Sequence, residues 1–133
     1  MNVAIVVSSY HRDITAEMLE AAEERVREWE AALKEKVTVA GAFEIPLAAQ
    51  RLARRKGIDA IVTLGFIEKG ETLHGQVLGN SVASALLEVA LASDKPVSFG
   101  VIGPGATHEQ ARKRVAKVAR EAVDAVMGAK VKL

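Results

Sequence analysis

Residues 3–7 read Val-Ala-Ile-Val-Val, five apolar residues in a row near the start of the chain. Such a continuous run is typical of a strand that is buried on both faces of a parallel sheet. Three more short runs of strand-forming residues follow, at residues 36–39, 59–64 and 96–102. The sequence therefore predicts four strands, which are separated by longer segments with the spacing of helices.

Four helices are predicted between and after these strands. We expect Asp13 to cap the first, whose apolar residues recur at spacings of three and four. These residues are Met18, Ala22, Val26, Trp29 and Leu33. The second helix begins near Pro46 and ends before Gly57. The fourth begins at Thr107, where the sequence Thr-His-Glu-Gln matches a capping box.

The third helix, which runs to about Ala92, differs from the others because it is apolar on nearly all sides. Its apolar residues include Val77, Leu78, Val82, Leu86, Leu87, Val89 and Leu91. A helix of this kind needs more than one neighbour to cover it. We expect that one of these neighbours is a second copy of the chain.

The predicted order of elements is βαβαβαβα. Right-handed crossovers then give an α/β fold, a three-layer αβα sandwich with a four-stranded parallel sheet. A chain of 133 residues is expected to form one domain, here over residues 1–133. In open parallel sheets of this kind, ligands bind beyond the carboxyl ends of the strands.

Composition narrows the function classes. The chain has 18 Lys and Arg against 17 Asp and Glu, so its net charge of +1 gives no reason to expect nucleic acid or an anionic membrane as a partner. It has no cysteine, which excludes disulfides, thiolate metal sites and cysteine nucleophiles. Its longest apolar stretch, residues 81–92, is interrupted by Ser84 and Glu88 and is too short to span a bilayer. No signal-peptide pattern precedes Val3, so we expect a cytoplasmic protein.

Polar groups gather in the four segments that follow the strands, at residues 8–11, 41–44, 65–74 and 100–107. Segment 65–74 leads into a helix, and the free amides of a helix N-terminus attract anions. It contains neither a Walker A motif nor a dinucleotide-binding fingerprint, and its glycines can serve the turn alone. His74 falls in the first helical turn, where an imidazole can transfer protons near neutral pH. From composition alone, it can also be an ordinary surface histidine.

The start of the last predicted helix carries a group of cations: His108, Arg112, Lys113 and Arg114. Positive charge is unfavourable near the N-terminal end of a helix dipole. Two interpretations remain open. The cations can bind an anionic substrate, or they can form a solvated basic face.

Several stretches together resemble the lumazine synthase family. These are residues 41–46 (Gly-Ala-Phe-Glu-Ile-Pro), residues 64–74, which end in Gly-Glu-Thr-Leu-His, residues 96–100 (Pro-Val-Ser-Phe-Gly) and residues 109–114. The loop at 103–107, Gly-Pro-Gly-Ala-Thr, resembles the archaeal members in particular. The resemblance covers essentially the whole chain, in order and almost without gaps.

The resemblance implies a flavodoxin-like fold and a transferase of riboflavin biosynthesis. Members of this family condense 5-amino-6-(D-ribitylamino)uracil with 3,4-dihydroxy-2-butanone 4-phosphate, giving 6,7-dimethyl-8-ribityllumazine, phosphate and water. They need no metal or organic cofactor. They form homopentamers, some of which close into icosahedral shells, so a homo-oligomer is expected here.

Carried over position by position, the resemblance also implies roles for individual residues. His74 is expected to transfer protons, and Glu71, Thr72 and Arg114 are expected to bind the phosphate. The residues expected to bind the ribitylaminouracil are Tyr10, Ala42, Phe43, Glu44, Phe66, Ile67, Glu68 and Phe99. In the family, the residues at the positions of Phe99 and Arg114 come from the neighbouring subunit.

The chain departs from the usual family pattern at some positions. Residues 10–11 read Tyr-His where most members have Phe-Asn, Ala40 replaces a proline, and Glu68 replaces an apolar residue. Residues 23–36 are rich in helix formers, a composition that is favoured where stability is selected or designed. An alternative is therefore an engineered self-assembling scaffold on the same fold, with weak or no catalysis.

A third interpretation is a monomeric flavodoxin-like domain, either a receiver or a flavin-binding protein, because both have the same sheet. Receivers need an acidic cluster at the end of the first strand. Residues 8–11, Ser-Ser-Tyr-His, do not supply one.

Aromatic residues are scarce, at 4% of the chain, which makes their positions informative. Four of the five rings fall in loops or strand ends of the expected site: Tyr10, Phe43, Phe66 and Phe99. Flat aromatic surfaces at these places suit a planar pyrimidine. Phe43 and Phe66 can also be ordinary core rings, and Trp29 is expected to serve packing or a subunit interface.

Overall fold

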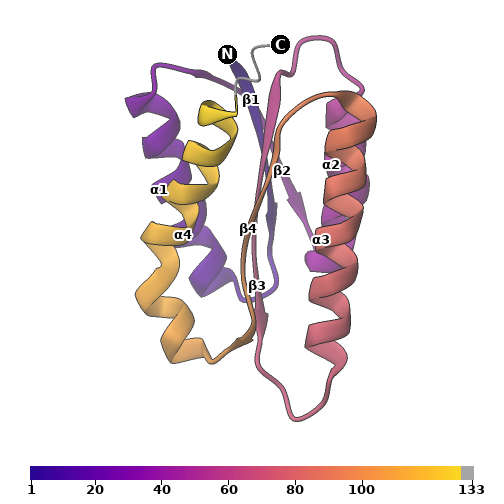
Figure 1. The fold of residues 1–133 in the computed structure, drawn as a ribbon. Helices are drawn as coiled ribbons and strands as arrows, with labels where there is room; N and C mark the ends of the chain where they lie inside the picture. Colours follow the sequence, from indigo (N-terminus) through magenta and orange to yellow (C-terminus); the bar gives the residue numbers. More distant parts are fainter. Residues whose placement is uncertain (130–133) are drawn as a thin grey trace.

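In the computed structural model, which describes residues 1–129, the chain folds as a three-layer αβα sandwich (Figure 1). The strands are β1 (Asn2–Ser8), β2 (Ala32–Val39), β3 (Ala60–Glu68) and β4 (Val97–Ala106). The helices are α1 (Arg12–Glu28), the short 3-10 helix η1 (Ala42–Glu44), α2 (Ile45–Ala53), α3 (His74–Ser93) and α4 (His108–Gly128). The predicted order and layering are confirmed.

The four strands are all parallel and lie in the order β2-β1-β3-β4. Helices α1 and α4 cover one face of the sheet, and α2 and α3 cover the other (Figure 1). Because the strands run in one direction, their carboxyl ends share one edge, which is at the bottom of Figure 1. This edge is where the segments that were singled out from the sequence come together.

The central strand β1 shows why its sequence is continuously apolar. Val3 and Ile5 pack under α1 and α4, whereas Ala4 and Val6 pack under α2 and α3. Both faces of the strand are therefore removed from water, as expected for a central parallel strand. The edge strand β2 instead alternates between exposed and half-buried residues.

Helix α1 ends at Glu28, so the prediction that it extends to Leu33 is wrong. Glu30 adopts φ 57°, a left-handed conformation that cannot continue the helix. The next strand begins four residues earlier than predicted and contains Leu33. Trp29 lies just beyond the helix and is 45% exposed, with its Nε1 donating to Asp124 Oδ1 at 2.8 Å. It is thus bonded to α4 of its own chain, and the expectation of a subunit interface at this residue stays a prediction.

The prediction that Asp13 caps α1 is also wrong. The N-cap position is His11, at φ 60°, and no side chain caps this helix. Asp13 lies in the first turn, where its carboxylate faces His108 and Arg112 of α4. Arg112 Nη2 donates to this carboxylate at 2.9 Å, and His108 Nε2 lies 2.6 Å from the same oxygen.

The ends of α4 and α2 are held by side chains. The predicted capping box of α4 is confirmed, because Thr107 Oγ1 accepts from Gln110 N at 3.1 Å and Gln110 Oε1 accepts from Thr107 N at 2.9 Å. At the carboxyl end of α2, Lys95 Nζ donates to the carbonyl oxygens of Ala53 and Arg55, each at 2.8 Å. These two bonds tie the end of α2 to the turn between α3 and β4.

Strands β3 and β4 each extend four residues beyond their predicted ends, β3 as far as Glu68. Residues 65–68 and 103–105, which were predicted as loops, therefore lie in strands. Gly103 makes this close pairing possible: its φ is 92°, and a Cβ atom there would collide with the carbonyl oxygen of Ile67.

Helix α3 keeps one apolar side uncovered within the chain. Gly79, Val82, Leu86 and Val89 are buried, whereas Val77, Leu87 and Leu91 are between 62% and 82% exposed. By length and composition, α3 alone among the helices of residues 1–129 could also cross a membrane, a test that interior helices often pass. The expectation that its second side is covered by another copy stays a prediction.

Candidate functional site

A cavity of about 480 Å³ opens at the carboxyl edge of the sheet, where the segments after β1, β2 and β3 meet the start of α3. Nine of the twelve residues expected at the site line it: Tyr10, Ala42, Phe43, Glu44, Phe66, Ile67, Glu68, Thr72 and His74. The parallel sheet brings them together from distant parts of the chain. Within residues 1–129, no three acidic or histidine side chains are arranged to hold a metal ion.

The three rings of this cavity differ in exposure. Phe66 is only 3% exposed and belongs to the core under α1 and α4, so it is both a core ring and the floor of the cavity. Tyr10 and Phe43 are 68% and 73% exposed, so neither is a core ring. Two aromatic faces therefore stand free at the rim, above a ring that the fold holds in place.

The segment after β2 lines another side of the cavity. Ala42 and Glu44 belong to η1, whose first residue follows Gly41. Glu44 N donates to the carbonyl oxygen of Gly41 at 3.2 Å, which closes the turn. A Cβ atom at Gly41 would lie 3.3 Å from Glu44 Oε1, so the glycine leaves room for this carboxylate.

The start of α3 forms the opposite side. His74 is the first residue of the helix and is exposed to the cavity. Its amide donates to Thr72 Oγ1 at 3.3 Å, and Leu73 at the N-cap position provides no side-chain cap. Glu71 lines an adjoining cavity of about 570 Å³, which it shares with Thr72 and Glu68. The N-terminal end of a long helix thus faces the cavity, and the first turn of this helix contains no acidic residue.

Phe99 and Arg114 do not line the cavity of their own chain. Phe99 pairs with Thr63, three residues before Phe66, which places it about 10 Å back along the sheet. Arg114 lies in a shallow depression beside β4, where its Nη1 donates to the carbonyl oxygen of Gln110 at 3.0 Å. Within one chain the expected site is therefore incomplete.

His11 is a residue of this cavity that the sequence interpretation did not assign to the site. Its ring centroid lies 4.5 Å from that of Tyr10 and 4.7 Å from that of Phe66. Its Nε2 lies 3.6 Å from Oε1 of Glu68. The available signal was its position directly after Tyr10, at the carboxyl end of a central strand.

Three of the four cations at the start of α4 face carboxylates of the same chain. His108 Nε2 lies 2.6 Å from Asp13 Oδ2, Arg112 Nη2 lies 2.9 Å from the same oxygen, and Lys113 Nζ lies 4.0 Å from Glu109. Desolvation raises the pKa of Asp13, but the His108 hydrogen bond and the charges of His108 and Arg112 outweigh it and lower the pKa. These three cations support the basic-face interpretation.

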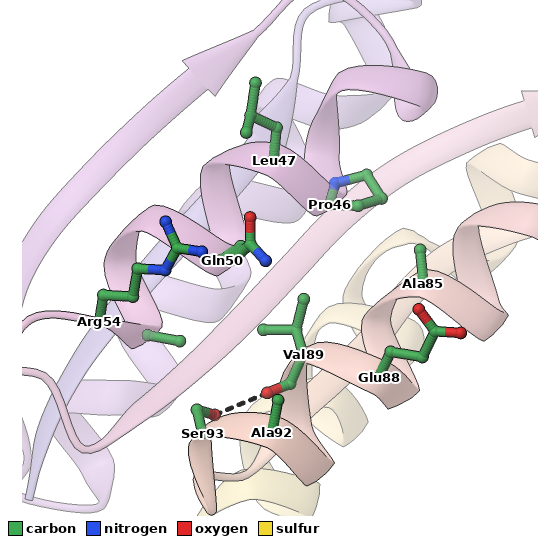
Figure 2. Close-up of a pocket in the computed structure, with 10 residues that line it drawn as sticks. Pro46, Leu47, Gln50, Arg54, Ala85, Glu88, Val89, Ala92 and Ser93 are labelled. Carbon is green, nitrogen blue, oxygen red and sulfur yellow. Dashed lines mark hydrogen bonds between the residues drawn. The ribbon is translucent and has the colours of Figure 1, made fainter.

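A larger cavity, of about 600 Å³, lies between α2 and α3, away from the residues expected at the site (Figure 2). Gln50 of α2 and Arg54, the residue that follows this helix, border it on one side, and Glu88 and Val89 of α3 border it on the other (Figure 2). Exposed Leu47 is also part of its wall. None of the residues that line this groove is aromatic or a histidine.

Comparison with known proteins identifies relatives over the whole length. A family model described as 6,7-dimethyl-8-ribityllumazine synthase matches residues 1–132. Proteins of this name are 42% identical over 127 residues in Metallosphaera sedula (96% of this chain, 84% of the relative), 43% over 124 residues in Halobacterium salinarum (93% of each) and 39% over 127 residues in Saccharolobus islandicus (96% and 82%). These comparisons give no support to the alternative of an engineered scaffold.

Proposed function

Because the chain belongs to the 6,7-dimethyl-8-ribityllumazine synthase family, we propose that it catalyses the reaction of that name in riboflavin biosynthesis. It condenses 5-amino-6-(D-ribitylamino)uracil with 3,4-dihydroxy-2-butanone 4-phosphate through imine formation, phosphate elimination and ring closure. The observation that carries the proposal is the cavity at the carboxyl edge, which joins aromatic surfaces for a pyrimidine to a helix N-terminus for a phosphate.

The pyrimidine binds among the rings of the cavity. Tyr10 and Phe43 offer exposed faces for stacking, and the buried ring of Phe66 forms a rigid floor. The backbone of Ile67 and Glu68, at the end of β3, holds the edge of the ring. Ordered strand backbone suits this task because its polar groups keep a constant direction.

The ribityl chain binds to the segment after β2. The Glu44 carboxylate accepts hydrogen bonds from its hydroxyl groups, and Ala42 leaves room for the chain beside it. Both residues belong to η1, which is joined directly to α2.

The phosphate of the second substrate binds at the start of α3. Amides at a helix N-terminus donate to phosphate oxygens, and the helix dipole favours the negative charge. Thr72 Oγ1 accepts from the His74 amide, which leaves its hydroxyl proton free to donate to the phosphate. Glu71 begins the same turn, and Arg114 of a neighbouring subunit adds a charge-assisted hydrogen bond.

His74 transfers protons in the proposed reaction. It lies at the cavity wall beside the phosphate site, and imidazole both accepts and donates protons near neutral pH. Imine formation moves protons from the attacking amine to the departing water. Holding the two substrates in contact supplies much of the remaining acceleration.

We infer that the active form is a homo-oligomer, a pentamer that can also be the unit of an icosahedral shell. Phe99 and Arg114 lie outside the cavity of their own chain, so the site needs them from a neighbour. The uncovered apolar side of α3 provides a surface for such a neighbour. We expect the assembly to be cytoplasmic and to act on small molecules, without nucleic acid or membrane partners.

The test is a turnover assay that follows the absorbance of the lumazine product from the two substrates. We expect a rate well above the spontaneous reaction, and a kcat about 100-fold lower in His74→Ala, which lacks the proton-transfer group. Lys113→Ala, which changes an exposed cation outside the cavity, keeps the wild-type rate. A wild-type protein that gives no rate above the spontaneous one contradicts the proposal.

A further inference from the structure

The cavity contains one carboxylate that faces a histidine. Glu68 ends β3, and its Oε1 lies 3.6 Å from Nε2 of His11 in the turn between β1 and α1. The two side chains thus connect neighbouring segments of the site. The side chain of Glu68 is 43% exposed, whereas that of His11 is 19% exposed. The histidine is therefore the more enclosed partner of the pair.

His11 is held in place from several directions. Its ring packs between those of Tyr10 and Phe66, with centroid distances of 4.5 and 4.7 Å. Its carbonyl oxygen accepts from the amides of Ile14 and Thr15 at 2.9 and 3.0 Å, which anchors the turn to the first turn of α1. A ring that is fixed in this way offers its Nε2 from a constant position.

Glu68 keeps acceptor capacity for a ligand. Within residues 1–129, its carboxylate has no hydrogen bond, and its Oε1 lies 3.6 Å from Nε2 of His11. An ionised carboxylate is purely an acceptor, with room for several hydrogen bonds on its two oxygens. The N–H and amino groups of a pyrimidine are donors that fit this carboxylate, whereas a ring edge of acceptors or methyl groups does not.

We propose that Glu68 is a specificity-determining residue that accepts a hydrogen bond from an N–H donor on the planar ligand, and that His11 is its positioning residue. The inference rests on the proposed function and specifies what the ring site selects: a planar heterocycle whose bound edge carries N–H donors. The exposed rings of Tyr10 and Phe43 supply flat surfaces for the heterocycle, and Glu68 accepts a hydrogen bond from its edge.

The first experiment measures binding without turnover. 5-Amino-6-(D-ribitylamino)uracil is titrated into the protein by calorimetry, without the second substrate, and is compared with the analogue methylated on both ring N–H groups. The wild type should prefer the unmethylated ring about 10-fold or more, the range expected for a hydrogen bond to a charged group. Glu68→Leu should reduce this preference to about 3-fold or less, whereas Glu68→Gln, which keeps an acceptor oxygen, should retain part of it.

Steady-state kinetics should show an effect on the ribitylaminouracil but not on the second substrate. In Glu68→Leu, the KM for the ribitylaminouracil rises about 10-fold, while the KM for the butanone phosphate and kcat change little. Glu109→Gln, which alters an exposed carboxylate outside the cavity, leaves both affinities unchanged. A preference for the unmethylated ring that is equally strong in Glu68→Leu overturns the role of Glu68.

A double-mutant cycle tests the role of His11. His11→Phe keeps a ring between Tyr10 and Phe66 but removes Nε2, and it should weaken binding of the unmethylated ring by about 3-fold. In the Glu68→Leu background, the same change should cause no further loss, because His11 acts only through Glu68. If His11→Phe weakens binding by the same factor in the Glu68→Leu background as in the wild type, the positioning role is overturned.

The two proposals can fail separately. A wild type that binds and discriminates the rings but has no turnover contradicts the proposed function and supports the inference. Normal turnover with unchanged discrimination in Glu68→Leu contradicts the inference alone. A wild type that does not bind the ribitylaminouracil contradicts both.

Discussion

Arg25 of α1 donates from Nε to Oδ1 of Asp124 in α4 at 2.7 Å, and the same oxygen accepts from Trp29 Nε1 at 2.8 Å. Arg25 also pairs with Glu28, which in turn accepts from Arg120 Nη2 of α4 at 3.0 Å. A network of charged hydrogen bonds thus joins the two helices that cover one face of the sheet.

Asp124→Asn should lower the free energy of unfolding by about 1 kcal/mol, a value typical of a partly exposed ion pair with good geometry. Urea denaturation measures this change. Lys113→Ala is the control, because Lys113 lies 4.0 Å from Glu109 in an exposed pair and should change stability by less than about 0.5 kcal/mol. Equal effects of the two substitutions would contradict a special role for the network.

The network also predicts how stability depends on pH. The Arg25 hydrogen bond lowers the pKa of Asp124, and the Arg120 hydrogen bond lowers the pKa of Glu28. A lowered pKa means that the folded state binds fewer protons than the unfolded state. The stabilisation is therefore complete above the unfolded pKa values, near about 4, and is lost as the pH falls through the lower folded values.

Urea denaturation at about pH 7, 5, 4 and 3 measures the free energy of unfolding across this range. Between about pH 4 and pH 3, the free energy of unfolding should fall less in Asp124→Asn than in the wild type. The variant lacks one of the carboxylates that titrate in this range. A variant that loses as much stability as the wild type would show that Asp124 does not contribute to the acid sensitivity.

A shared active site predicts complementation between two inactive variants. His74→Ala lacks the imidazole of the cavity, and Arg114→Ala lacks the cation that a neighbour provides. Random co-assembly of the two chains should restore roughly a quarter of the wild-type turnover, because some sites combine both intact residues. Turnover of the co-expressed mixture is compared with that of each variant. A mixture no more active than its components would show that Arg114 acts within its own subunit.

The uncovered side of α3 predicts how assembly can be broken. Leu87 and Leu91 are 64% and 82% exposed in the single chain. If a neighbour covers them, Leu87→Glu and Leu91→Glu bury a charge in the interface and should release smaller species in sedimentation velocity. Glu24→Lys, on the exposed side of α1, is the control and should keep the wild-type mass. A wild type that sediments as a monomer would remove the basis of this prediction.

Two glycines of β4 predict a graded loss of stability. Gly103 and Gly105 have φ values of 92° and 95°, but a Cβ atom collides with Ile67 only at Gly103, since nothing lies within 4 Å at Gly105. Gly105→Ala should cost about 1–2 kcal/mol for its backbone conformation, and Gly103→Ala should cost more. Thermal unfolding measures both. Equal losses would show that the strands separate easily at Gly103.

Much of the fold could be predicted because the strands at the centre of a parallel sheet leave a clear apolar pattern, as in residues 3–7. The ends of elements were harder. Gly65 looks like a turn residue, but it lies inside β3, where a Cβ atom would be 3.0 Å from Ser8 Oγ of the neighbouring strand. Leu33 fits the apolar spacing of the first helix as well as it fits a strand. The left-handed conformation of Glu30, which ends the helical segment before Leu33, is not visible in the sequence.

Residues that line the cavity could be predicted where one segment supplied its own motif, as around His74. The place of His11 in the cavity was missed because its neighbour Glu68 lies far along the chain and comes close to it only through the sheet. The places of Phe99 and Arg114 could not be understood from one chain in either sequence or structure. Their expected function depends on a surface that a second copy provides.

The unequal exposure of the three rings has a thermodynamic consequence. A heterocycle that covers Tyr10 and Phe43 takes aromatic surface out of water, so its binding should carry a negative change in heat capacity. Phe66 contributes nothing to this change, because folding has already dehydrated it. The heat-capacity change of ligand binding should therefore come from Tyr10 and Phe43, whereas Phe66 only fixes the orientation of the bound ring.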